Sequence, residues 1–372
     1  MTPGPVDVPS EALLEMARPI FHHRTAKFRE LLEETTGLLK QVFRTKSDIV
    51  TFTSSGTGAM EASIVNILRK DEKALFVSGG KFGERWGNIA KAFGIETVEI
   101  KMPYGNAVDP EDIRKALDAD PKIKAVYTTL CETSTGVVHD IRAIGKIVKD
   151  TDVLLVVDGI SSVGAVEIET DEWGVDMLVV GSQKALMIPP GLAFLTVNDK
   201  AWAKVEQVSA PAFYLSLKAA RKSMAKSDTP YTPAITLIAG LKQSLDMIVT
   251  EGVENVWKRH AKLADATRAG VKALGLELFA ESPSNSVTAV KVPEGVDGAK
   301  IPSKMAEDHG IRIAGGQADM KGKIFRIGHM GYVDKIDVIG VLAALEMTLA
   351  DLGHKFDVGA SLRAAQDIFL AG

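Results

Sequence analysis

Two polar side chains follow two short apolar runs near the middle of the chain. Asp158 comes directly after the run at residues 153–157, and Lys184 comes shortly after the run at residues 176–180. Such runs are typical of buried parallel strands, whose carboxyl ends meet at one edge of a sheet. Because open α/β sheets bind their ligands at that edge, we expect Asp158 and Lys184 to share one site.

A lysine at a strand end, among small and apolar neighbours, loses solvation and is driven towards its neutral amine. A neutral amine can attack a carbonyl carbon and form a covalent link. Alone, Lys184 would more simply be one of 44 basic residues that closes a strand. With Asp158 beside it, the pair fits pyridoxal phosphate, whose pyridinium nitrogen needs an anionic partner.

Composition and charge exclude several classes of protein. The chain has 372 residues, 46% hydrophobic and 25% charged, which is enough for a large core and about two domains. A net charge of −4 offers no basic surface for nucleic acid. No apolar run approaches the roughly 18 residues of a membrane span, and the first residues do not resemble a signal peptide. The single cysteine, Cys131, fits a reducing compartment, so we expect a soluble cytoplasmic protein.

Strand-like and helix-like segments alternate along most of the chain. Apolar runs at residues 48–52, 74–77, 96–100 and 125–129 are separated by amphipathic helical patterns. This rhythm predicts right-handed β–α–β units, and therefore an α/β fold with a mainly parallel central sheet and helices on both faces.

We expect three parts in the chain. Prolines rule out a helix at the start, so residues 1–15 are predicted to form an extended arm that lies against something. A large domain would follow at 16–252, and a smaller C-terminal α/β domain at 253–372. The smaller domain is expected to have a strand at 276–279 and a last helix from 335 to about 352.

The segment at residues 53–58 joins the first predicted strand to a helix expected at 59–68. Its hydroxyls and the free N–H groups of a helix start suit a phosphate, although an ordinary helix cap explains the same residues. The segment lacks the P-loop lysine and its spacing, so we do not expect a nucleotide triphosphate site. Further along, residues 209–229 lose all periodicity and are expected to be exposed and mobile.

Arg326 lies inside an apolar strand pattern at residues 324–328, where a buried guanidinium needs an anion. One explanation is a structural salt bridge to one of the 48 acidic residues. The other is a bidentate contact with the carboxylate of a substrate. Cys131, by contrast, is best explained as a small buried thiol.

Five segments in order resemble the class V aminotransferases, most closely the alanine–glyoxylate and serine–pyruvate group. They are residues 82–85, 132–136, 158–162, 181–186 with the Pro-Pro-Gly turn at 189–191, and 325–328. The resemblance covers nearly the whole chain, from the Pro-Gly-Pro arm onward. It implies a fold-type I transferase that depends on pyridoxal phosphate and forms a homodimer with shared active sites.

The resemblance also implies a role for each matching residue. Lys184 would carry the cofactor covalently, Asp158 would pair with its ring nitrogen, and Thr133 would bond the 3-hydroxyl side. Ile160 would lie beneath the ring, and Phe82 would stand where many relatives have a stacking tryptophan. The implied phosphate contacts are Ser55, Gly56, Thr57, Gln183 and, across the dimer interface, Tyr231 or Thr232.

The implied reaction moves an amino group from a small amino acid, such as alanine or serine, to a 2-oxo acid such as glyoxylate or pyruvate, with ping-pong kinetics. A cysteine desulfurase-like lyase would need a catalytic cysteine late in the chain, where none occurs. A phosphonate transaminase would differ only in how it binds the acidic tail of its substrate, and it remains an alternative. An inactive scaffold would have lost Lys184 or Asp158.

Overall fold

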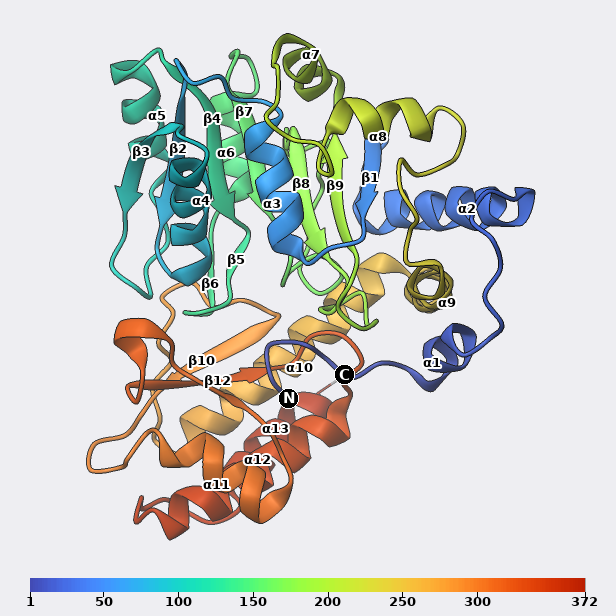
Figure 1. Ribbon diagram of the computed structural model, residues 1–372. Helices are drawn as coiled ribbons and strands as arrows, with labels where there is room; N and C mark the ends of the chain where they lie inside the picture. The colour runs from blue at the N-terminus through green and yellow to red at the C-terminus, as the bar shows by residue number, and fades with distance from the viewer. Residues whose placement is uncertain (372) are drawn as a thin grey trace.

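The computed structural model describes residues 1–371, in which a seven-stranded sheet and a three-stranded sheet dominate (Figure 1). The larger sheet lies in the upper half of the figure and the smaller one below it. The larger sheet has the spatial order β1 (Asp48–Phe52), β9 (Ala193–Val197), β8 (Met177–Gly181), β7 (Leu154–Asp158), β4 (Ile123–Thr129), β2 (Lys73–Ser78) and β3 (Glu96–Lys101).

The larger sheet is mainly parallel, as the alternation of strands and helices predicted. Strands β3, β2, β4, β7 and β8 pair in parallel, whereas β9 is antiparallel to both β8 and β1. Strands β7, β8 and β9 are buried at every position. Burial on both faces explains why these strands are continuous apolar runs.

Helices cover both faces of this sheet. Successive residues of β7 alternate between the two faces, with Leu155 packed in one apolar cluster and Val156 in the other. One cluster takes side chains from α2 (Ala26–Val42), α6 (Ile141–Val148) and α9 (Ile235–Glu251). The other takes side chains from α3 (Gly56–Val65), α4 (Lys81–Ala92), α7 (Asp199–Gln207) and α8 (Leu217–Met224).

The smaller sheet is antiparallel, with β12 (Ile324–Gly328) between β10 (Val287–Lys291) and β11 (Ala314–Gly315). Its own apolar core includes side chains of α10 (Val253–Ala273), α11 (Lys300–His309), α12 (Lys335–Asp351) and α13 (Ala360–Leu370). Gly252, with φ of 90°, separates α9 from α10. The division into domains at 16–252 and 253–372 stays a prediction. No helix within residues 1–371 has the length and apolarity to cross a membrane.

Four local expectations were wrong in whole or in part. Residues 276–279 do not form a strand, because only an isolated bridge joins Leu278 to Val290. The helix α12 is not the last one, since α13 follows it, and α13 lies against α10. Residues 209–229 contain a helix, α8, whose Leu217 and Ala220 are buried, although the basic side chains of this stretch are exposed as expected. The arm is extended only to Pro9, because α1 (Ser10–Met16) follows.

The first residues of the arm tie the two sheets together, which answers what the arm lies against. The carbonyl of Met1 accepts a hydrogen bond from the backbone of Gly328 in β12, at 2.9 Å. The backbone N–H of Val6 donates to the carbonyl of Gln183, just past β8, at 3.1 Å. The arm therefore crosses the junction at the level where β8 ends.

Candidate active site

Three strands of the larger sheet end side by side, and the loops that follow them build the site. The register aligns Thr129 of β4 with Asp158 of β7, and Asp158 with Val179 of β8. Asp158 is therefore the last residue of its strand and lies beside the loop that carries Lys184. This is the sheet edge that the apolar runs predicted.

Lys184 lies partly buried under the N-terminal arm. Its Nζ donates to the carbonyl of Pro3 at 2.5 Å. Gly4 has a φ of 104°, which favours glycine, and a Cβ atom there would come within 2.5 Å of the same nitrogen. Burial lowers the pKa of Lys184 to about 8, although the charge of Asp158 opposes this shift. Near neutral pH the amine is therefore much closer to its neutral form than an exposed lysine is.

Asp158 is 4% exposed, and burial raises the pKa of its carboxyl to about 7. Its Oδ1 accepts a hydrogen bond from the backbone N–H of Ile160 at 2.8 Å, which opposes the shift. No other hydrogen bond to this carboxylate occurs within the described chain, so Oδ2 is left for a further donor. A cationic ring N–H, as in pyridoxal phosphate, fits that need.

The helix α3 starts earlier than expected, at Gly56, which makes Ser55 its N-cap residue. The hydroxyl of Ser55 makes no capping bond, so the first N–H groups of the helix remain available to an anion. The side chain of Ile160 fills the space where Gly56 would carry a Cβ atom. The loop after β1 therefore meets the loop after β7 at a helix start that fits a phosphate.

Gln183 and Thr57, at the phosphate end of the site, differ in whether their side chains already have hydrogen-bond partners. The Oε1 of Gln183 is buried and finds no hydrogen-bond partner among residues 1–371. An orphaned buried acceptor needs a donor from outside the chain, whereas turning the amide over would present its Nε2 donor to an acceptor such as a phosphate oxygen. The Oγ1 of Thr57 accepts a hydrogen bond from Nη1 of Arg85 at 3.0 Å, so part of its capacity is already used.

Arg85 is a site residue that sequence reasoning missed. Its guanidinium lies 4.8 Å from the ring centre of Phe82, besides its contact with Thr57. The available signal was the spacing of three residues from Phe82, which places both side chains on one face of α4.

Arg326 is 4% exposed and bonds only to backbone carbonyls. Its Nε and Nη2 donate to Gly315 at 3.1 and 2.9 Å, and its Nη1 donates to Thr133 at 2.9 Å. No acidic side chain of the described residues forms a salt bridge with it, so the structural salt bridge is not found. One N–H on each terminal nitrogen remains, and this is the pair that a carboxylate binds in bidentate fashion.

Thr133 connects Arg326 with the loop after β7. Its carbonyl receives the bond from Arg326, and its hydroxyl donates to Oγ of Ser161 at 2.6 Å. Cys131, two residues earlier, is 3% exposed, and burial raises the pKa of its thiol. This confirms a buried thiol in place of a nucleophile.

Tyr231 and Thr232 are not brought to the phosphate end of this chain's own site. The hydroxyl of Tyr231 donates to the carbonyl of Phe213 at 3.2 Å, and its ring stacks on Tyr214 at 5.1 Å. Thr232 is exposed. Within the described residues, neither side chain bonds to Ser55, Gly56, Thr57 or Gln183.

The buried charge of Lys184 should cost stability, so removing it should stabilise the cofactor-free protein. The folded-state pKa of about 8 lies below the ordinary value of 10.5, so the unfolded chain binds more protons between these pH values. Stability of the natural protein therefore rises with pH in that window. We expect Lys184→Met to raise the Tm by a few degrees at pH 7, with a gain that shrinks towards pH 10.5.

Differential scanning calorimetry of the cofactor-free proteins across this pH range measures the effect. The exposed Lys355 provides the control, since Lys355→Met should leave Tm nearly unchanged. A lower Tm for Lys184→Met at pH 7 would show that the lysine stabilises the fold.

Comparisons with known proteins agree on one family. The family model described as aminotransferase class-V matches residues 15–333. The small subunit of the soluble hydrogenase of a Synechococcus strain is 42% identical over 99% of this chain and 97% of its own. The L-aspartate–glyoxylate aminotransferase of Paracoccus denitrificans is 36% identical, over 98% of this chain and 94% of its own.

A solved structure agrees with these matches. Ureidoglycine–glyoxylate aminotransferase from Bacillus subtilis is 31% identical and covers 99% of this chain and 97% of its own, with a TM-score of 0.94. The chain therefore belongs to the class V aminotransferase family and is a transaminase that uses pyridoxal phosphate.

Proposed function

We propose that this transaminase moves an amino group from a small amino acid, with alanine or serine as first candidates, to glyoxylate or pyruvate. The observation that carries the proposal is the arrangement of Lys184, Asp158 and the two remaining donors of Arg326 around one sheet edge. Two relatives that differ in their amino donor, aspartate and ureidoglycine, are both named for glyoxylate. We therefore favour glyoxylate as the acceptor.

The geometry of the site supports the following proposed cofactor contacts. Lys184 would carry pyridoxal phosphate, Asp158 would accept the ring N–H on its Oδ2, and Phe82 and Ile160 would enclose the ring. Thr133 would bond on the side of the 3-hydroxyl. Bound pyridoxal phosphate supplies an electron sink for the α-carbon of the substrate. The proposed phosphate contacts are Ser55, Gly56, Thr57 and Gln183.

Three side chains of the protein then do separate work. Arg326 holds the α-carboxylate of the amino acid and so orients the α-hydrogen. The amine of Lys184, with its lowered pKa, accepts that proton as a general base and, once protonated, can donate it again as a general acid. Asp158, whose charged form a neighbouring cation would favour, would keep the ring nitrogen of the cofactor protonated.

The hydrogenase name of one relative does not extend to this chain. Iron–sulfur clusters are held by several cysteine thiolates. This chain contains one cysteine, Cys131, and it is buried. The single cysteine also supports the cytoplasm as the proposed location, because the thiol would stay reduced there.

A homodimer is proposed on the basis of an exposed aromatic cluster, defined as Phe213, Tyr214 and Tyr231. Phe213 is 82% exposed, and its ring centre lies 5.7 Å from that of Tyr231. Tyr214 reaches the carbonyl of Thr53, next to the proposed phosphate loop, at 3.4 Å. An exposed cluster of aromatic side chains beside a site is typical of a surface that another protein chain covers. We propose that a second copy covers the cluster and receives a phosphate contact from Tyr231 or Thr232.

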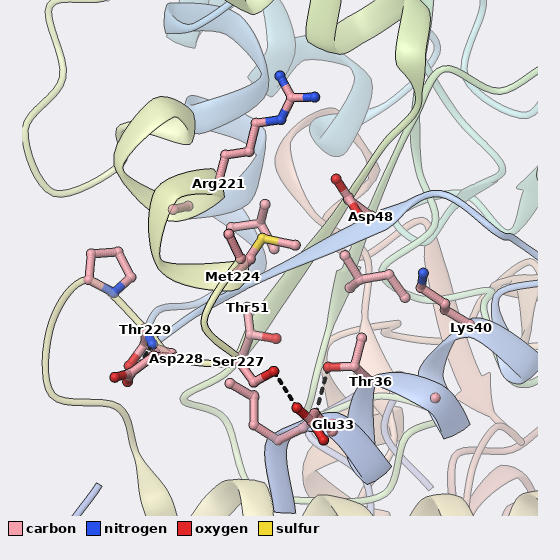
Figure 2. A pocket seen from close by; sticks show the side chains of 17 residues that line it. Glu33, Thr36, Lys40, Asp48, Thr51, Arg221, Met224, Ser227, Asp228 and Thr229 are labelled. Carbon is pink, nitrogen blue, oxygen red and sulfur yellow. Dashed lines mark hydrogen bonds between the residues drawn. The ribbon is translucent and has the colours of Figure 1, made fainter. Parts of the chain in front are cut away.

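A pocket of about 520 Å³ lies on the neighbouring surface (Figure 2). It opens between α2, α8, the edge strand β1 and the segment at 227–230, and Pro230 precedes Tyr231 of the aromatic cluster. Polar groups along its wall bond with one another, as Ser227 does with Glu33. None of the proposed cofactor or substrate residues lines it. We therefore assign it to the proposed dimer face and not to catalysis.

Activity with defined substrates tests the function. Adding pyridoxal phosphate to the cofactor-free protein should produce a visible absorbance band, and an amino donor with glyoxylate should give glycine. Alanine, serine and aspartate as donors, each with glyoxylate, pyruvate and 2-oxoglutarate, define the preference. Lys184→Ala should lose activity and the borohydride-reducible cofactor link, and a link that survives this change would refute the assignment.

Arg326→Lys tests the carboxylate contact. An ammonium cannot reproduce the planar pair of donors, so we expect KM to rise roughly tenfold or more for every donor and acceptor. The cofactor absorbance should remain, because Arg326 is not assigned to cofactor. A variant with lower Tm and unchanged KM would mean that Arg326 is purely structural.

The dimer is tested by a substitution in the aromatic cluster. Phe213→Asp should raise the dimer dissociation constant roughly tenfold or more and weaken pyridoxal phosphate binding with it. Sedimentation and absorbance titration measure the two effects. Val358→Asp, at a position 76% exposed in the smaller unit, should change neither. A natural protein that sediments as a single chain while binding the cofactor tightly would exclude the shared site.

A further inference from the structure

Glu132 is a buried acid to which no step of the proposed function assigns a role. It ends β5 (Cys131–Glu132), is 1% exposed, and burial raises the pKa of its carboxyl. Its Oε2 accepts from the backbone N–H groups of Phe82 and Gly83 at 3.1 and 2.8 Å. Its Oε1 accepts from the N–H and the hydroxyl of Ser134 at 3.0 and 2.6 Å. Four donors thus converge on one carboxylate.

These bonds fix the start of α4. The N-cap residue of that helix is Gly80, which has no side chain to cap the first turn. A Cβ atom at Gly80 would overlap the Glu132 carboxylate and come within 2.5 Å of the Ser134 hydroxyl. That hydroxyl in turn accepts from the N–H of Lys81 at 3.0 Å. Glu132 and Ser134 therefore take the place of a local cap, and the negative carboxylate suits the positive helix end.

The same segment fixes Arg326. Thr133 lies between the two capping residues, and its carbonyl receives the Nη1 bond at 2.9 Å. Because Glu132 holds Ser134 through both its N–H and its hydroxyl, the peptide that carries this carbonyl is clamped. The negative charge of Glu132 also favours the charged form of Arg326.

We propose that Glu132 is a positioning residue that sets the cofactor ring contact and the substrate carboxylate contact together. It acts through Phe82 on the first and through the carbonyl of Thr133 on the second. The proposal rests on the roles given above to Phe82 and Arg326.

Glu132→Gln tests this with little change in shape. An amide offers one acceptor oxygen, so either the α4 N–H groups or the two donors of Ser134 lose their acceptor. We expect the dissociation constant for pyridoxal phosphate and the KM for both amino donor and keto acceptor each to rise roughly tenfold. Absorbance titration of the cofactor-free protein measures the first, independently of turnover.

The chain offers a closely matched control in Glu346 of α12. This glutamate is 5% exposed and caps α13 in the same manner, accepting from the N–H of Gly359, and from the N–H and hydroxyl of Ser361. Glu346→Gln should lower Tm and leave cofactor affinity and KM unchanged. If Glu132→Gln behaves like Glu346→Gln, with a lower Tm alone, the positioning role is overturned.

A double substitution tests the path through Thr133. If Glu132 acts on KM by way of Arg326, the KM increase of the double variant should be smaller than the product of the increases in Glu132→Gln and Arg326→Lys. Fully multiplicative effects would contradict that path. Ser134→Ala removes one donor to Glu132 and the acceptor for Lys81, so it should also weaken cofactor affinity, but less than Glu132→Gln does. It replaces Glu132→Gln in this test if that variant does not fold.

A failure of the proposed function itself would look different. In that case the natural protein would neither bind pyridoxal phosphate nor produce glycine, before any variant is compared. A natural protein that does both, together with normal affinity and KM in Glu132→Gln and Ser134→Ala, would reject only the role of Glu132.

Discussion

Burial of ionisable groups at one sheet edge is the constraint on which the site depends. Burial is the largest cause of each pKa shift: downward for Lys184 and Arg326, upward for Asp158 and Glu132. Charged groups taken out of water cost free energy unless another group compensates them. Burial of apolar side chains around β7 and β8 must offset the free-energy cost of burying these ionisable groups. The site is therefore built at the ends of β7 and β8, two strands that are buried at every position.

Backbone groups, more than opposite charges, compensate these side chains. Arg326 bonds to two carbonyls, Glu132 accepts three backbone N–H groups, and Asp158 accepts one. Backbone dipoles in strands and helix ends are fixed by the fold, so they orient a side chain without neutralising it. Arg326 consequently has no acidic partner among the described residues and keeps two donors for the proposed carboxylate. An acidic partner in the same place would have competed with the substrate.

Much of the fold was predictable because short segments of the sequence determine the type of each strand and helix. Apolar runs ending in Asp158 and just before Lys184 marked the sheet edge, and an arginine in a strand pattern pointed to the carboxylate contact that we propose. The direction of β9 was not predictable, because an apolar run has the same appearance whether its neighbour is parallel or antiparallel. The helix α13 and the missing strand at 276–279 depend on packing against α10 and β10, which a local pattern does not record. The role of Glu132 was hidden for a similar reason, since its donors lie about fifty residues earlier, at Phe82 and Gly83.

The position of Arg326 depends on both halves of the molecule. One of its carbonyl partners, Gly315, belongs to the smaller sheet, and the other, Thr133, follows the larger one. The N-terminal arm bonds to Gly328, two residues from Arg326, and to Gln183, beside Lys184. The distance between Arg326, the proposed carboxylate-binding group, and Lys184 is therefore set by contacts that cross the junction. Both halves of a transamination bind a carboxylate and move a proton at the neighbouring carbon, so one fixed distance between these two groups serves the amino donor and the keto acceptor alike.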